Sequence, residues 1–170
     1  MKRSAVALIL QVRDGQLHIL MIKRAEREGD PWSGHMAFPG GRKDPGDVNG
    51  FACALRETQE EIGLQLEPGD TCIGRLSEMN AMSRVRGLGM AVTPFVFRLQ
   101  REVTFSPNHE VAEVVWVPLD FLLDRNNREK MVWSYKGIDI PLSCYHYQGR
   151  RIWGLSLGML DELLSLIKNK

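Results

Sequence analysis

The chain has 170 residues, of which 44% are hydrophobic and 25% are charged, and its formal net charge is +1. This composition is typical of one globular domain with a substantial core. A net charge so close to zero gives no strong field for nucleic acid or a membrane surface, so we expect neither as a partner. The cysteines have scattered spacings that form no metal motif and favour a reducing, cytoplasmic location: Cys53, Cys72 and Cys144.

Hydrophobic periodicity and turn residues predict interleaved strands and helices. Strands are expected at residues 5–12, 18–23, 36–38, 42–43, 71–78, 90–99 and 111–117, with short extended pieces at 131–135 and 144–147. Helices are expected at residues 51–62, 119–123 and 154–168, the first ending at Gly63. No apolar run approaches the ~18 residues that span a bilayer. The order lacks clean βαβ repetition and contains no linker, which predicts an α/β fold with one mixed sheet and helices on both faces.

The predicted helix at 51–62 carries a cluster of negative charge. Glu57, Glu60 and Glu61 project within a sector of roughly 100°, because a helix advances about 100° per residue. Like charges at this spacing repel one another and destabilise a helix. A bound hard cation such as Mg²⁺, which takes oxygen ligands, would compensate for that repulsion. The competing interpretation is a solvated acidic face with Arg56 as an ion-pair partner.

A glycine-rich segment precedes this helix. Phe38-Pro39-Gly40-Gly41 contains two adjacent glycines, which allow the backbone to approach a ligand closely. Asp44-Pro45-Gly46-Asp47 then predicts a second tight turn. A strand, a glycine-rich loop and an acidic helix in this order can place backbone carbonyls and carboxylates around one metal ion. The ordered combination therefore favours a metal site over a solvated face.

These segments together resemble the box motif of the Nudix hydrolase family. Gly41 opens the pattern, and Arg-Glu-Thr-Gln-Glu-Glu-Ile-Gly-Leu at residues 56–64 closes it. The resemblance implies a single Nudix domain over residues 1–170, folded as an α/β/α sandwich with a mixed sheet, and a box at approximately residues 41–64. It also implies a metal-dependent hydrolase that cleaves the pyrophosphate bond of a nucleoside diphosphate derivative.

Two positions of the box depart from the family pattern. Asp47 stands in place of the first glutamate, and eight residues rather than seven separate it from Arg56. Thr58 occupies a position that is usually apolar. Asp44 or Asp47 is therefore expected to take over the orienting role of the first glutamate.

The resemblance assigns catalytic and metal-binding roles within the box. Glu57 and Glu61 are expected to be the principal ligands of Mg²⁺ or Mn²⁺, and Glu60 is expected to complete the site or to hold a coordinated water. The Gly40 carbonyl is expected to supply a backbone ligand. Arg56 is expected to orient Glu57 or its neighbours through a bidentate pair.

Residues outside the box are expected to complete the site. Glu110 is the candidate general base, with an exposed loop carboxylate as the alternative interpretation, and His109 is a weaker candidate for proton transfer. Arg24 is expected to contact phosphate, with a surface strand-end arginine as its alternative. The other expected substrate contacts are Phe38 and two loop arginines that would otherwise be solvated, Arg84 and Arg86.

The segments that select the substrate resemble the coenzyme A pyrophosphatase branch of the family. Arg24 after a strand and Gly34 three residues before Phe38-Pro39-Gly40-Gly41 match its signature, and Trp153-Gly154-Leu155 is similar to the same branch. The second arginine of that signature is missing from its expected place within residues 26–32. The best interpretation is coenzyme A or a derivative, and the alternatives are a nucleotide sugar, ADP-ribose or a dinucleotide.

The expected partner is therefore a small-molecule nucleoside diphosphate in the cytoplasm. The competing class is a non-catalytic Nudix-fold regulator that binds a nucleotide metabolite. Such proteins usually lose box glutamates, and all three are present here. Many members of the family form homodimers, although no segment of this chain marks an interface.

Overall fold

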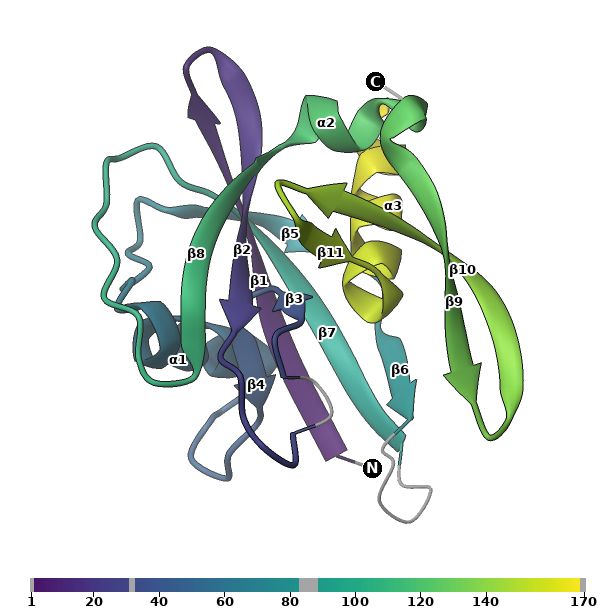
Figure 1. The fold of residues 1–170 in the computed structure, drawn as a ribbon. Coiled ribbons are helices and arrows are strands. Elements are labelled where there is room, and N and C mark those ends of the chain that lie inside the picture. The colour runs from purple at the N-terminus through teal and green to yellow at the C-terminus, as the bar shows by residue number, and fades with distance from the viewer. Residues whose placement is uncertain (1, 31–32, 83–88, 169–170) are drawn as a thin grey trace.

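A computed structural model describes residues 2–30, 33–82 and 89–168, and its ribbon shows a mixed sheet between helices (Figure 1). The main sheet has eight strands: β1 (Lys2–Arg13), β2 (Gln16–Arg24), β3 (Met36–Ala37), β4 (Gly40–Arg42), β5 (Thr71–Arg75), β6 (Met79–Met82), β7 (Gly89–Arg98) and β8 (Val111–Pro118). A second sheet has three: β9 (Arg128–Tyr135), β10 (Ile138–Tyr147) and β11 (Arg150–Ile152). The helices are α1 (Gly50–Ile62), α2 (Leu119–Leu123) and α3 (Gly154–Lys168), with a 3₁₀ turn η1 (Arg125–Asn127). The predicted fold class is confirmed.

Strand β1 lies in the middle of the main sheet because its apolar side chains are buried on both faces. Residues 7–10 are at most 5% exposed. This strand pairs antiparallel with β2 and parallel with β7. Its N-terminal half also pairs with β4, where Val6 lies opposite Gly40. That pairing holds the glycine-rich loop at the centre of the sheet, next to the box helix.

Alternate residues of β1 pack against helices on opposite faces of the sheet. Ile9 belongs to an apolar cluster that includes Leu55 and Ile62 of α1. Leu8 belongs to a second cluster, to which α3 contributes Leu160. Helices therefore cover both faces, as the interleaved order predicts. None of the helices in the described part of the chain is long and apolar enough to cross a bilayer.

Helix α1 is fixed at both ends. Asn49 is its N-cap, and the side-chain oxygen accepts a hydrogen bond of 2.8 Å from the Ala52 N–H. At the other end Gly63 has φ 70° and its N–H donates to the Gln59 carbonyl, which confirms the predicted helix end. These caps fix where the helix begins and ends, and the packing of Leu55 and Ile62 against the sheet turns the opposite side, with the three glutamates, away from the core.

The strand predicted at residues 71–78 is divided into two. Strand β5 pairs with the C-terminal half of β7, where Thr71 lies opposite Arg98. Strand β6 pairs with the N-terminal half of β7, where Met79 lies opposite Val92. Pairing of β5 continues past a register shift between Cys72 and Gly74 as far as Arg75, opposite Phe95, and it resumes at Met79, so residues 76–78 separate the two strands.

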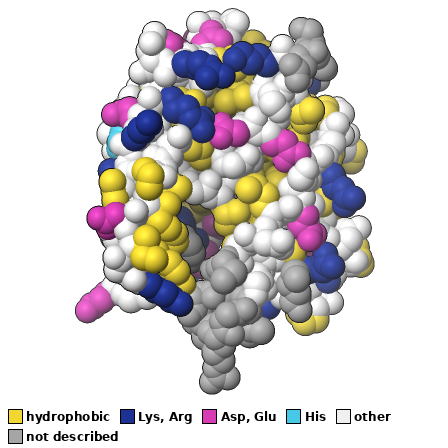
Figure 2. All heavy atoms as spheres, turned by 90° about the vertical axis from the view of Figure 1, so that its right-hand side faces the viewer, with side chains coloured by type: hydrophobic (Ala, Val, Ile, Leu, Met, Phe, Trp, Pro, Cys, Tyr) yellow, Lys and Arg dark blue, Asp and Glu magenta, His cyan; other side chains and the backbone are white. Residues whose placement is uncertain are grey.

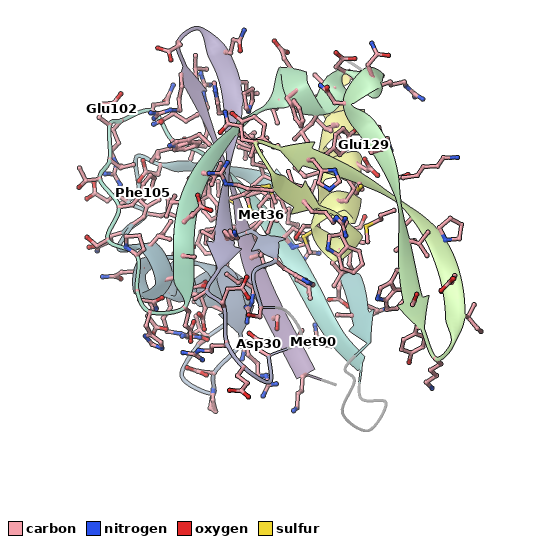
Figure 3. The ribbon with its side chains drawn as sticks, in the orientation of Figure 1. Asp30, Met36, Met90, Glu102, Phe105 and Glu129 are labelled. Atoms are coloured by element: carbon pink, nitrogen blue, oxygen red, sulfur yellow. The ribbon has the colours of Figure 1, made fainter. Side chains whose placement is uncertain are left out.

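The second sheet is more extensive than predicted. Strands β9 and β10 form a hairpin that begins well before residue 131 and includes residues 138–143, and β11 adds a strand that periodicity did not indicate. Figure 3 places Glu129 of this sheet on the opposite side of the molecule from Glu102 and Phe105, which lie on the loop before β8. The face that carries the hairpin shows apolar side chains among charged ones (Figure 2). The hairpin is therefore a separate layer beside the main sheet, away from α1.

Candidate active site

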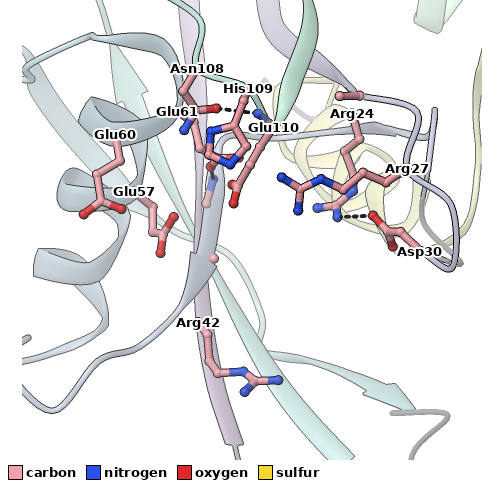
Figure 4. A pocket seen from close by; sticks show the side chains of 13 residues that line it. Arg24, Arg27, Asp30, Arg42, Glu57, Glu60, Glu61, Asn108, His109 and Glu110 are labelled. Atoms are coloured by element: carbon pink, nitrogen blue, oxygen red, sulfur yellow. Dashed lines mark hydrogen bonds and ion pairs between the residues drawn. The ribbon is translucent and has the colours of Figure 1, made fainter.

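A cleft of about 790 Å³ lies where α1, β4 and two loops meet (Figure 4). Carboxylates of α1 lie on one side of it, and Arg24 at the end of β2 and Arg27 in the loop after β2 lie on the other. Its lining consists of Arg24, Ala25, Arg27, Asp30, Gly40, Gly41, Arg42, Glu57, Glu60, Glu61, Asn108, His109 and Glu110. The fold thus brings the glutamates of the box, the candidate base and Arg24 to one cavity, as the sequence interpretation requires.

The three glutamates of α1 differ in their exposure to solvent. Glu61 is 4% exposed, and its Oε1 accepts a hydrogen bond of 2.7 Å from the Gly40 N–H. The Glu57 side chain is 16% exposed, whereas that of Glu60 is 55% exposed. Glu57 and Glu61 are therefore the two carboxylates held most firmly at the floor of the cleft, and Glu60 lies at its rim.

The glycines of the box allow this close packing. A Cβ atom at Gly41 would lie 2.6 Å from the Glu57 carboxyl carbon, a distance that requires one of the two groups to move. A Cβ atom at Gly40 would collide with the Ala5 carbonyl oxygen of β1. Glycine is needed here because backbone and carboxylate approach each other closely, as the Gly-Gly pair predicts. The Gly40 amide orients Glu61, and the metal-ligand role of the Gly40 carbonyl stays a prediction.

Arg56 joins the carboxylates of the box into one network. It forms a bidentate pair with Asp47, Nε to Oδ1 and Nη2 to Oδ2, both at 2.9 Å. Its Nη1 donates to Glu57 at 3.1 Å and to Glu60 at 3.1 Å. The bidentate partner is thus Asp47 rather than Glu57, although Arg56 contacts both. Asp44 is the more distant partner, at 3.5 Å.

Asp47 takes the central position in this network despite the altered spacing of the box. Its side chain is buried and accepts a hydrogen bond of 2.8 Å from the Asp44 N–H. The hydrogen bonds from Arg56 lower the pKa of Asp47 to about 2. The other departure, Thr58, is fully buried, and its hydroxyl donates to the Ala54 carbonyl at 2.7 Å. A threonine is therefore accommodated at the usually apolar position without an unsatisfied hydroxyl.

The two carboxyl groups at the floor of the cleft, Glu57 and Glu61, have raised pKa values. Burial raises the pKa of Glu61 to about 7, and the nearby Glu57 and Glu110 carboxylates add to this shift against the hydrogen bond from Gly40. Burial also raises the pKa of Glu57, although Arg56 opposes the shift. These carboxylates are close together, poorly solvated and incompletely neutralised by the protein. Strongly raised carboxyl pKa values in a cleft are typical of functional sites.

A loop before β8 carries the candidate base to the same cleft. The Asn108 N–H donates to the Glu61 carbonyl at 2.8 Å, and the Ala25 N–H donates to the Glu110 carbonyl at 2.9 Å. Glu110 and His109 both line the cavity. Glu110 is close enough to Glu57 and Glu61 to raise the pKa of each.

Arginines form the opposite wall. Arg24 pairs with Asp30 at 2.9 Å, and its Nε is a buried donor that the described residues leave without a protein acceptor. Arg27 and Arg42 also line the cleft, and the sequence interpretation had omitted both. The alternation of β4 could have indicated Arg42, which follows the two glycines. Arg27 lies in a loop without periodicity, so no sequence signal pointed to it.

One expected substrate contact, Phe38, is not among the described residues that line this cavity. Phe38 is 4% exposed and belongs to the apolar cluster on the α3 side of the sheet, so the prediction that it contacts substrate is wrong. Alternation explains the error, because Phe38 follows Met36 on the core-facing side. Arg84 and Arg86 lie outside the described residues.

The donor set of the cleft fits a hard divalent cation. Glu57, Glu60 and Glu61 supply carboxylate oxygens, which Mg²⁺ and Mn²⁺ prefer. Burial, together with neighbouring carboxylates, raises the pKa of Glu57 and of Glu61, and a bound cation would favour their ionised forms. Within residues 2–30, 33–82 and 89–168, no three acidic, histidine or cysteine side chains already converge as a metal site. Arg56 instead contacts Glu60, and the Gly40 amide donates to Glu61.

Comparison with known proteins identifies the family. A family model described as the NUDIX domain matches residues 1–136. The chain belongs to the Nudix family. It is 32% identical to the peroxisomal coenzyme A diphosphatase NUDT7 of Mus musculus over 97% of this chain and 68% of that protein. It is 31% identical to an uncharacterized Nudix hydrolase, NudL, of Enterobacter over 95% of this chain and 81% of that protein. This Nudix protein is accordingly a hydrolase of the pyrophosphatase type.

Solved structures agree on the fold of this Nudix hydrolase. A C. elegans Ap4A hydrolase in a binary complex superposes with a TM-score of 0.66 at 16% identity, covering 100% of both chains. A MutT/nudix family protein from Enterococcus faecalis gives a TM-score of 0.65 at 17% identity, covering 98% of this chain and 62% of that one. At such low identity these likenesses establish the fold alone.

Proposed function

We propose that this Nudix hydrolase cleaves the pyrophosphate bond of coenzyme A or one of its derivatives, with Mg²⁺ or Mn²⁺ bound by the box glutamates. The observation that carries the proposal is the arrangement of the cleft, in which the acidic floor of α1 faces arginines across one cavity. Carboxylates can hold a cation while arginines bind phosphate oxygens directly. A diphosphate fits between two such surfaces.

The choice of coenzyme A rests on two independent points. The mouse relative, which shares 32% identity, is named a coenzyme A diphosphatase. The cleft also holds Arg27 beside Arg24, so a second arginine is present although its place in the sequence differs from the expected signature. Coenzyme A carries a further phosphate beyond its diphosphate, and additional arginines suit a substrate with additional negative charge.

The proposed reaction is attack of water on one phosphorus of the diphosphate. The bond between that phosphorus and the bridging oxygen breaks, and the electron pair leaves with the bridging oxygen. Glu110 accepts the proton from the attacking water. Arg24 and Arg27 bind the phosphate oxygens, and their positive charge stabilises the negative charge that develops. A cation held by Glu57, Glu60 and Glu61 would neutralise the diphosphate and lower the pKa of the water.

The network around Arg56 has a supporting role. Its contacts with Asp47, Glu57 and Glu60 fix the carboxylates without using the substrate side of the cleft. Such outer partners keep ligands in the geometry that a metal ion requires. We therefore assign Arg56 and Asp47 to orientation of the site rather than to chemistry.

A substrate panel with each cation tests the proposal. We expect turnover of coenzyme A to exceed that of ADP-ribose, nucleotide sugars and diadenosine polyphosphates. Cleavage of another member of the panel without cleavage of coenzyme A would refute the substrate while leaving the pyrophosphatase chemistry intact. Absence of any turnover, with nucleotide binding retained, would favour a non-catalytic regulator.

Variants of the glutamates test the roles within the site. Glu57→Gln removes a charge but keeps the shape of the side chain, and we expect kcat to fall by roughly 10²–10⁴-fold. Glu110→Gln should lower kcat by a similar factor, about 10²–10⁴-fold, because the base is lost. Glu102→Gln, at an exposed loop position outside the cleft, is the matched control and should leave kcat unchanged. Unchanged turnover in Glu57→Gln would contradict the metal assignment.

A further inference from the structure

The loop that carries Glu110 is bonded directly to the end of the box helix. The Ser106 N–H donates to the Ile62 carbonyl at 2.8 Å, and the Asn108 N–H donates to the Glu61 carbonyl at 2.8 Å. Carbonyls in the last turn of a helix have no partner within the helix, so the loop satisfies two of them. Gly63 leaves room for this contact, since a Cβ there would lie 2.9 Å from that of Ser106. These hydrogen bonds therefore fix the position of the loop relative to the end of α1.

The peptide groups of Glu110 are held from two sides. Its N–H donates to the side-chain Oδ1 of Asn108 at 2.9 Å. Its carbonyl accepts a hydrogen bond of 2.9 Å from the Ala25 N–H, next to Arg24. A continuous series of hydrogen bonds thus runs from Glu61 through Asn108 and Glu110 to Ala25, the neighbour of Arg24 in the sequence. Within this series, the bond made by the Asn108 side chain is the one that a substitution can remove.

We propose that Asn108 is a positioning residue for catalysis, which sets the Glu110 carboxylate relative to the carboxylates of α1. This inference rests on the proposed role of Glu110 as the base. A general base acts only within hydrogen-bond reach of the water it deprotonates. A misplacement of about 1 Å can cost about 10²-fold in rate. Because the carboxylate extends from the Glu110 backbone, the orientation of that peptide decides where the carboxylate can reach.

The first experiment compares Asn108→Ala with Asn108→Ser. Alanine removes the acceptor, whereas a serine hydroxyl can accept a hydrogen bond from the same Glu110 N–H. We expect kcat on coenzyme A to fall by roughly 10–100-fold in the alanine variant, with KM nearly unchanged. The serine variant should recover most of this loss. Both variants keep the backbone bond to Glu61, so melting temperatures should stay close to that of the wild type.

Asn108 also lines the cleft, so a direct contact with substrate must be separated from positioning. The double variant with Glu110→Gln provides that separation. If Asn108 acts through Glu110, the alanine substitution should have little further effect once the base is gone, since residues that act as a unit are not additive. Additive losses, or a loss confined to KM, would overturn the inference.

A matched control removes a hydrogen bond of the same type elsewhere, in which a side-chain oxygen accepts from the backbone N–H two residues later. Asp124 accepts a hydrogen bond of 2.9 Å from the Asn126 N–H at the end of α2, outside the cleft. Asp124→Ala should leave kcat unchanged. The outcomes distinguish three failures: no turnover by the wild type refutes the proposed function, an active Glu110→Gln variant refutes the base, and additivity refutes the positioning role alone.

Discussion

The raised pKa of Glu61 predicts how the stability of the metal-free protein depends on pH. The pKa is raised from an ordinary value of 4.5 to about 7, chiefly by burial. The folded state therefore binds a proton more tightly than the unfolded state does. Stability from this group is fully present below about pH 4.5 and decreases as the pH rises through about 7. The metal-free protein should accordingly be more stable at about pH 5 than at about pH 8.

The size of this effect follows from the shift. Each pKa unit corresponds to about 1.4 kcal/mol, so a pKa raised from 4.5 to about 7 corresponds to roughly 3 kcal/mol of unfolding free energy. For a chain of this size about 1 kcal/mol changes the melting temperature by about 2–4 °C. Glu61 should therefore change the melting temperature by about 10 °C between the low-pH and the high-pH end of this range.

Thermal unfolding in the presence of a chelator measures the slope of melting temperature against pH. The Glu61→Gln variant has a neutral side chain that still accepts a hydrogen bond from the Gly40 N–H. It should flatten this slope and raise the melting temperature at about pH 8. Glu102→Gln is the control and should leave the slope unchanged. Divalent cation should stabilise the wild type at high pH much more than the Glu61 variant. An equal slope in wild type and Glu61→Gln would refute the reasoning.

Three further predictions concern the box and the thiols. Gly41→Ala should lower kcat by about tenfold or more because its Cβ displaces the carboxylate of Glu57, a proposed metal ligand. Gly46→Ala, with open space around its Cβ position, should be neutral in the same assay. Asp47→Asn should lower activity or metal affinity by roughly 10–100-fold because Arg56 loses its bidentate partner. Titration with Mn²⁺ measures the metal affinity, and unchanged affinity and activity would contradict this prediction. In thiol labelling of the native protein, Cys72 should react rapidly and the two buried cysteines should react only after denaturation; fast labelling of all the thiols would contradict the described burial.

The elements around the site were predictable because their signals are local. Apolar periodicity and a terminal Gly63 define α1, and the carboxylates follow from its rotation. The second sheet was predicted poorly for a physical reason. Ile138, Ile140 and Leu142 do alternate with other residues along β10, but one of the intervening positions is Pro141, which is unfavourable in a strand interior and argues against a strand.

The composition of the cleft was predictable only in part. Glu57 and Glu61 could be found from the box, since one helix places both. Arg27 and Asn108 come from loops whose approach to α1 depends on tertiary hydrogen bonds, such as that between the Ala25 N–H and the Glu110 carbonyl. Sequence spacing carries no information about such approaches.

The parallel pairing of β1 with β7 has a consequence for the order in which the protein folds. Strand β1 precedes the other described strands in the sequence, yet Lys2 lies opposite Met90 and Leu10 opposite Arg98. Closing so long a loop costs conformational entropy before the contact stabilises anything, which slows folding. The entire box lies within that loop. Refolding experiments should therefore show catalytic competence appearing together with the slow formation of the central sheet, rather than with the early formation of α1.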